Sequence, residues 1–89
     1  MTHVIDRTGQ PEKYNVTKLQ ASIRAACLSV RTPIGEADLT AERVCREIAD
    51  WLETKAEITA NDLRRKAALP LQIYNPEAAY VYAELNNLT

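Results

Sequence analysis

Serine, histidine and carboxylate side chains are the groups that would make this chain a catalyst, and their placement does not favour catalysis. Ser22 and Ser29 fall inside a helical pattern, without the sharp glycine-flanked turn that exposes a nucleophilic serine. His3 is the single histidine, and it stands near the chain start with no obvious partner to orient it as a base. The acidic residues are spread over expected helix surfaces, where charged groups ordinarily only solvate a face. We therefore expect no enzymatic activity.

Metal chemistry is equally disfavoured. The two cysteines, Cys27 and Cys45, form with His3 neither a CxxC pair nor any zinc-ligand spacing. Both cysteines occupy apolar positions of amphipathic patterns, which favours buried free thiols in a reducing compartment. A disulfide between them stays open as the alternative. We expect no metal site built from the protein's own ligands.

Phosphate binding would need a glycine-rich loop or a local cluster of cations. The chain has only two glycines, Gly9 and Gly35, so it has no glycine-rich phosphate loop. Eleven Lys and Arg against twelve Asp and Glu give a formal net charge of −1 and a pI of ≈ 5.8. A general nucleic-acid binder usually carries a basic excess, so we do not expect DNA as a partner. The basic run of Arg64, Arg65 and Lys66 indicates either a solvated helix face or a local phosphate contact.

Length and hydropathy limit the class of protein further. The 89 residues are 46% hydrophobic and 26% charged, which is ordinary for one small globular domain over residues 1–89. The first ten residues, MTHVIDRTGQ, have no apolar signal region, and no window approaches the ~20 apolar residues of a membrane span. We expect a cytoplasmic protein with no membrane partner.

The elements that must position any site begin with a β-hairpin over about residues 3–15. Residues 3–7 are β-prone, residues 8–11 carry turn-forming types, and residues 12–15 extend the chain again. A hairpin of this size is not stable alone, so it must lie on the remainder of the chain.

Apolar residues at helical spacing then predict four helices, over about residues 16–30, 39–55, 60–74 and 76–86. The signals for their ends are a cap at Asn15 or Thr17, a break over residues 31–35, a start at Asp38 or Thr40, a capping box of Thr59 with Asp62, and the start signal Asn75–Pro76–Glu77. We expect Pro70 to disturb the third helix and residues 86–89 to fray. The fold class is α+β, mainly helical: a hairpin followed by four short helices.

With a hairpin and four helices expected in this order, the chain resembles an ATP-cone domain. The resemblance is carried by Val4, Arg7, Thr8–Gly9, Tyr14–Asn15 and Lys18, then by a long second helix, Ile58–Thr59 before the third helix, and the closing alanine-tyrosine helix from Pro76 to Tyr80. ATP cones are regulatory modules that bind ATP or dATP, at the ends of ribonucleotide reductases and in the repressor of their genes. The resemblance covers nearly the whole chain and implies a β-hairpin lid over a four-helix bundle.

The resemblance also implies a binding site. Val4, Tyr14, Asn15, Leu19 and Leu63 would surround the adenine, Glu12 would sit near the base or sugar, and Arg7, Lys18 and Arg64 would face the phosphates. The ligand would be ATP or dATP, with Mg²⁺. We expect a nucleotide-sensing domain that modulates ribonucleotide reductase, another partner or its own association, as an excised terminal module or a free-standing cone.

Departures from the family pattern leave alternatives open. Asp6 stands where the family commonly has a basic residue, and a lost charge-assisted contact costs about 1.5–3 kcal/mol. Thr8 replaces the usual aspartate, and the last helix ends in Glu84–Asn87 without basic residues. One alternative is a degenerate cone that acts as a protein-interaction module without nucleotide. Another is a transcriptional regulator that touches DNA through residues 64–66, which the acidic balance disfavours.

Overall fold

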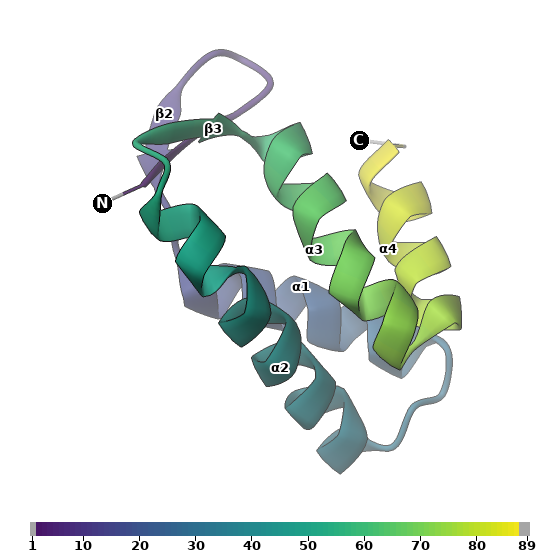
Figure 1. Cartoon of the computed structure of the whole chain (residues 1–89). Helices are drawn as coiled ribbons and strands as arrows, with labels where there is room; N and C mark the ends of the chain where they lie inside the picture. Colours follow the sequence, from purple (N-terminus) through teal and green to yellow (C-terminus); the bar gives the residue numbers. More distant parts are fainter. Residues whose placement is uncertain (1, 88–89) are drawn as a thin grey trace.

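Four helices and a small three-stranded sheet make up the described part of the chain, residues 2–87, in the computed structural model (Figure 1). In chain order they are β1 (His3–Ile5), β2 (Pro11–Lys13), α1 (Val16–Ser29), α2 (Ile34–Glu53), β3 (Glu57–Thr59), α3 (Ala60–Tyr74) and α4 (Pro76–Asn87). The expected α+β, mainly helical class is confirmed. The hairpin and the four helices all lie where the sequence pattern predicts them, apart from the bounds of α2.

The sheet has the strand order β2-β1-β3 and lies at one end of the helices (Figure 1). Strand β1 pairs with β2 as the expected antiparallel hairpin, with Val4 opposite Glu12. It also pairs in parallel with β3, with Val4 opposite Ile58. The sequence did not predict β3, because three residues are too few for the alternation of exposed and buried positions to be recognised as a strand. The added strand ties the hairpin to the start of α3.

Thr2 fixes the hairpin to the far end of α2. Its side chain is buried, and the hydroxyl donates to the carbonyl oxygens of Leu52 at 2.7 Å and Lys55 at 2.9 Å. The backbone carbonyl of Thr2 also accepts from the N–H of Tyr14 at 2.9 Å. The hairpin is therefore held by α2 as well as by β3.

Helix α2 begins earlier than predicted. The expected start at about residue 39 is wrong, because the helix begins at Ile34, whereas its last residue, Glu53, is close to the expected end at about residue 55. Ile34 and Gly35 belong to the first turn rather than to the break, and Pro33 is the N-cap residue, its carbonyl accepting from Ala37 N at 2.9 Å. The break itself is short, with Arg31 in the left-handed conformation at φ 65°.

The other helix ends follow the sequence signals. Asn15, rather than Thr17, caps α1, its Oδ1 accepting from the N–H groups of Thr17 and Lys18. The capping box of α3 is confirmed. The expected disturbance at Pro70 is wrong, because α3 continues through Pro70 to Tyr74 without interruption. Asn75 Oδ1 accepts from Ala78 N at 3.2 Å at the start of α4. Helix α4 runs to Asn87, so it includes positions 86 and 87 of the tail that was expected to fray. Positions 88 and 89 of that tail lie outside the described residues.

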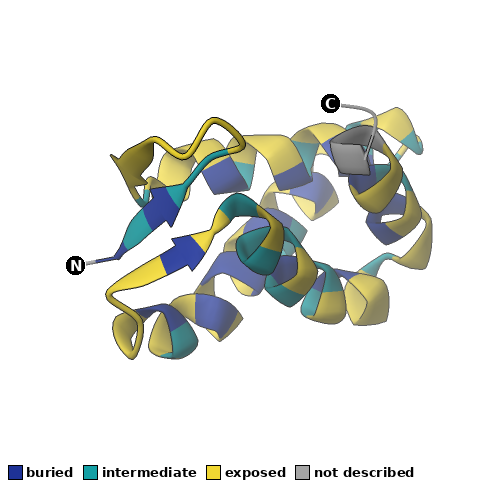
Figure 2. Cartoon of the chain, turned by 90° about the horizontal axis from the view of Figure 1, so that it is seen from above, coloured by how far each residue is buried: buried dark blue, intermediate teal, exposed yellow. Residues whose placement is uncertain are grey.

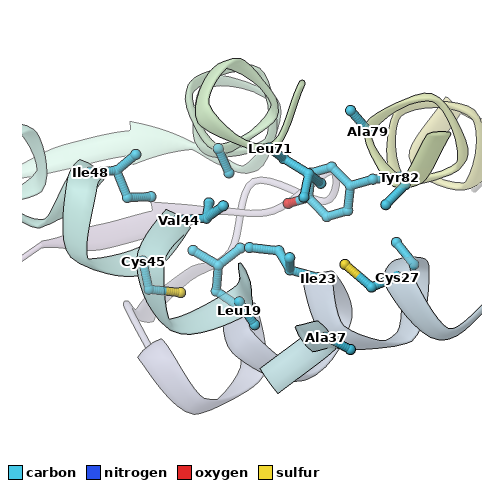
Figure 3. Packing of buried hydrophobic residues seen from close by; sticks show 14 of the residues in the cluster. Leu19, Ile23, Cys27, Ala37, Val44, Cys45, Ile48, Leu71, Ala79 and Tyr82 are labelled. Carbon is cyan, nitrogen blue, oxygen red and sulfur yellow. The ribbon is translucent and has the colours of Figure 1, made fainter. Parts of the chain in front are cut away.

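The core lies between the inward faces of the four helices, as the burial pattern shows (Figure 2). Its largest fully buried side chains are Ile23, Val44, Ile48 and Leu71, and Tyr82 reaches from α4 into the same cluster (Figure 3). Cys27 and Cys45 are buried free thiols, as expected from their apolar positions. No helix within residues 2–87 has the length and apolar character needed to cross a membrane.

Candidate functional site

Two adjoining cavities lie between the hairpin, α1 and α3. The first, which we name the turn cavity, has a volume of ≈ 330 Å³ and is lined by Asp6 and Arg7 beside the hairpin turn and by Thr59, Ala60, Asn61 and Arg64 of α3 and its cap. The second, the tyrosine cavity, has a volume of ≈ 220 Å³ and includes Tyr14 and Tyr82. Both cavities share Ala60 and Arg64. Together they fall within the range of about 300–1,000 Å³ that small-molecule sites occupy.

The predicted site residues come together here. The tyrosine cavity is lined by Val4, Glu12, Tyr14 and Asn15 from the hairpin segment, and by Lys18, Leu19, Leu63 and Arg64 from the helices. Arg7, the ninth predicted residue, lines the turn cavity, where Arg64 also lies. All nine residues therefore border one continuous region, although Leu63 and Arg64 are far from the others in sequence.

Several lining residues were not predicted from the sequence. Ser22, Tyr82 and Lys13 also border the tyrosine cavity, and Thr59 and Asn61 border the turn cavity. The capping box at Thr59 was a usable signal, because a helix start presents backbone N–H groups to any ligand placed there. No local pattern distinguishes Tyr82 from the other tyrosine of its helix, Tyr80.

Apolar surface and two phenol groups form the wall of the tyrosine cavity. Val4 and Leu19 are buried core residues that also line it. Burial raises the pKa of Tyr14 to about 12, and the neighbouring Cys45 and Tyr82 side chains add to the shift. Burial likewise raises the pKa of Tyr82 to about 12, against the opposing effect of the nearby Arg64 charge. Tyr14 Oη is buried and forms no hydrogen bond of normal geometry with the described residues.

Three polar residues at the rim of the tyrosine cavity already have partners. Glu12 Oε1 accepts from Lys18 Nζ at 3.2 Å, which joins β2 to α1. Asn15 uses its side-chain oxygen to cap α1. Lys18 therefore meets a carboxylate in this structure, and a phosphate would have to take that carboxylate's place.

The turn cavity is well suited to an anion. The start of α3 forms one wall, and the first N–H groups of a helix lack intrahelical partners and carry its positive dipole end. Arg7 and Arg64 both line this cavity, and arginine presents a planar fork that matches phosphate oxygens. The capping box already occupies two of the N–H groups at this helix start, because Thr59 N donates to Asp62 Oδ2 and Asp62 N donates to Thr59 Oγ1.

Asp6 shapes the hairpin turn. Its Oδ1 accepts from Thr8 N at 2.9 Å, Thr8 Oγ1 at 2.7 Å and Gln10 N at 2.9 Å. Gly9 completes the turn at φ 84°, a left-handed conformation that favours glycine. The Thr8 hydroxyl first, and then the turn's backbone donors, hold the pKa of Asp6 below its ordinary value. Asp6 and Thr8, both departures from the cone pattern, are thus partners in one turn.

The basic run divides between two environments, because Arg65 and Lys66 line one further pocket together with Trp51 and Asp62. Arg64 lines both cavities, Arg65 pairs with Asp62, and Lys66 Nζ lies 5.4 Å from the centre of the Trp51 ring. Of these three cations, only Arg64 borders the tyrosine and turn cavities.

Within residues 2–87 no group of three or more His, Cys, Asp or Glu side chains gathers as a metal site. The region consists of an apolar slot with two tyrosines beside a pocket that Arg7 and Arg64 line. No protein-family model matches the chain, and a search of the curated proteins finds no match. The resemblance to an ATP-cone domain accordingly stays a prediction from the sequence.

Proposed function

We propose that this protein is a nucleotide-sensing regulatory domain that binds ATP or dATP across the tyrosine cavity and the turn cavity. The observation that carries the proposal is the convergence at Arg64: an apolar slot and a cationic pocket, lined by the nine expected residues, meet at this side chain. A nucleotide has the same division into an apolar ring and an anionic tail.

The adenine occupies the tyrosine cavity in this proposal. Val4, Leu19 and Leu63 supply apolar contact to the ring faces, and Tyr14 and Tyr82 add aromatic surface. Glu12 and Asn15 offer polar groups for the edge of the base or for the sugar. Few polar groups around an apolar slot are what fixes the orientation of a planar ligand.

The phosphates occupy the turn cavity. Arg7 and Arg64 supply charge, and the N–H groups at the start of α3 supply directed donors. Lys18 lines the tyrosine cavity and not the turn cavity, so it would reach the phosphates only after leaving Glu12. Because both side chains of that pair are more than half exposed, the exchange costs little.

Regulation follows from how the hairpin is anchored. β1 is paired to β3 at the start of α3, and Thr2 fixes it to the end of α2. A nucleotide that draws the hairpin toward α3 would therefore also act on α2. Because a ligand shifts an equilibrium only through differential affinity, the two states must differ in these contacts. By its resemblance, the chain would act on ribonucleotide reductase or on its own association.

The test is a calorimetric titration with ATP, dATP and GTP, each with and without Mg²⁺. We expect saturable binding of the adenine nucleotides, reduced by about tenfold or more in the Arg7→Ala, Lys18→Ala double variant because charge-assisted contacts are lost. Arg46→Ala is the matched control, since Arg46 is exposed on α2 and borders neither cavity. Unchanged affinity in the double variant would remove those two residues from the site.

A degenerate cone that serves as a protein-interaction module is the second candidate. The observation that favours it is the acidic residue Asp6 in the lining of the cavity assigned to the phosphates. This candidate predicts no heat and no thermal shift with millimolar nucleotide, together with a protein partner recoverable by pull-down.

A further inference from the structure

Asp6 is the one carboxylate that borders the turn cavity among the described residues. A triphosphate in this cavity would meet the cations of Arg7 and Arg64 and also the negative charge of Asp6. Two anions in contact repel each other unless a cation lies between them. The position of Asp6 therefore either opposes the ligand or recruits a cation to it.

The two oxygens of Asp6 are in different situations. All three hydrogen bonds that the side chain accepts go to Oδ1, from Thr8 and Gln10. No hydrogen bond or ion pair involves Oδ2 within residues 2–87. The turn thus fixes the orientation of the carboxylate and leaves one oxygen with coordination capacity. The same donors favour the ionised form, which is the form that a divalent cation binds.

A metal ion that the protein binds permanently needs several protein ligands. Asp6 supplies only one, and the described residues contain no group of three or more His, Cys, Asp or Glu side chains that could hold the ion. Mg²⁺, however, is commonly bound through one or two carboxylates together with substrate phosphates, and it keeps several of its waters. A single fixed carboxylate oxygen is sufficient for a cation that arrives with the nucleotide.

We propose that Asp6 Oδ2 ligates, directly or through a coordinated water, a Mg²⁺ ion carried by the nucleotide phosphates, so that the ligand of this protein is the magnesium complex and not free ATP. This inference rests on the proposed nucleotide site. In this proposal Asp6 recognises the Mg²⁺ ion of the complex, whereas a basic residue at the same position would bind the metal-free triphosphate.

The decisive variant is Asp6→Asn. Asparagine keeps an Oδ1 acceptor for Thr8 and Gln10, so the turn can form, but its second atom is an NH₂ donor that cannot ligate a metal. Asp50→Asn is the matched control, because it removes one exposed carboxylate of α2 that borders neither cavity. Thermal unfolding of both variants establishes that each is folded.

ATP is titrated into each protein in excess Mg²⁺ and in excess chelator. We expect wild type and Asp50→Asn to bind about tenfold to a hundredfold more tightly with Mg²⁺, and Asp6→Asn to lose most of this ratio. In excess chelator, Asp6→Asn should bind ATP more tightly than wild type does, because the repulsion between the Asp6 carboxylate and the ATP phosphates is removed. Equal wild-type affinity in both conditions overturns the role of Asp6 while leaving the nucleotide site intact. No binding in either condition overturns the proposed function itself.

A second measurement does not depend on the variant. Mn²⁺ added with ATP to isotopically labelled wild type broadens amide signals close to the metal. We expect the strongest broadening at the turn amides of Arg7, Thr8 and Gly9, and only in the presence of ATP. Strong broadening elsewhere, with the turn unaffected, overturns the assignment to Asp6.

Discussion

Lys18 Nζ lies 3.2 Å from Glu12 Oε1, and this ion pair closes the rim of the tyrosine cavity between β2 and α1. The two side chains are 70% and 56% exposed, so the pair contributes only about 0–1 kcal/mol to stability. A contact this weak can hold the hairpin near α1 in the free protein and still be exchanged for a phosphate.

The first prediction follows from that exchange. Lys18→Ala should weaken ATP binding by about tenfold, because one charge-assisted contact is lost, and should change the free energy of unfolding by less than about 1 kcal/mol. Calorimetry gives the affinity, and urea denaturation gives the stability. Lys66→Ala is the control of the same type, since Lys66 lies over the Trp51 ring and borders neither cavity. Equal weakening by both substitutions would mean that net charge, and not Lys18, sets the affinity.

The second prediction concerns the core on which the site rests. Leu71 of α3 is fully buried, so Leu71→Ala should lower the free energy of unfolding by about 2–5 kcal/mol through lost contacts and a cavity. Leu69, in the same helix, is 64% exposed, and Leu69→Ala should cost less than about 0.5 kcal/mol. Urea denaturation of the pair measures the difference. A large cost at Leu69 would indicate that its side chain is covered in solution.

Elements with strong local signals could be predicted from the sequence. The cap at Asn15 and the Thr59–Asp62 box each act within one turn of helix, so the local sequence contains the relevant chemistry. Helix α2 was mispredicted for the converse reason. Pro33 and Gly35 are ordinary helix breakers, whereas here Pro33 stands just before the helix and Gly35 is accommodated in its first turn.

Long-range features could not be predicted. Strand β3 exists because Ile58 pairs opposite Val4, more than fifty positions away in the chain. In the candidate site, the hairpin and α1 residues are close in sequence, but Tyr82 reaches the cavity only through the packing of α4 against α1. Asp6 is a mismatched charge in the sequence, and only the turn geometry reveals its bonds to Thr8 and Gln10.

The third prediction is a loss of stability in acid. The pKa of Asp62 is lowered by the backbone and hydroxyl of Thr59 and then by Arg65, and that of Asp6 by the turn donors. A carboxyl whose pKa is lower in the folded state stabilises the fold above its unfolded pKa of about 4, and this contribution disappears as the pH falls through the folded value. Thermal melts between neutral pH and about pH 3 should show the loss. Asp62→Asn should reduce this acid sensitivity relative to Asp50→Asn, and equal sensitivity would exclude Asp62 as a source.

The fourth prediction is a loss of stability in alkali, traced to the tyrosine cavity. Burial raises the pKa values of Tyr14 and Tyr82 to about 12. A phenol that ionises at about pH 10 in the unfolded chain favours the folded state fully below that pH, and its contribution disappears as the pH rises toward 12. Phenolate absorbance should therefore rise in two steps, with the buried tyrosines ionising only as the protein unfolds.

Two substitutions on α4 separate this effect from general alkaline damage. Tyr82 is 4% exposed and Tyr80 is 69% exposed, two positions apart in the same helix. Tyr82→Phe should remove part of the alkaline loss of stability between pH 10 and 12. The reason is that phenylalanine has no hydroxyl to ionise on unfolding, whereas the phenol of Tyr82 has a pKa that burial raises in the folded state. Tyr80→Phe should leave the loss unchanged and remove absorbance from the first step only. If Tyr82→Phe melts with the same pH dependence as Tyr80→Phe, the phenol of Tyr82 is accessible to water in the folded protein, and the tyrosine cavity is more open than this packing implies.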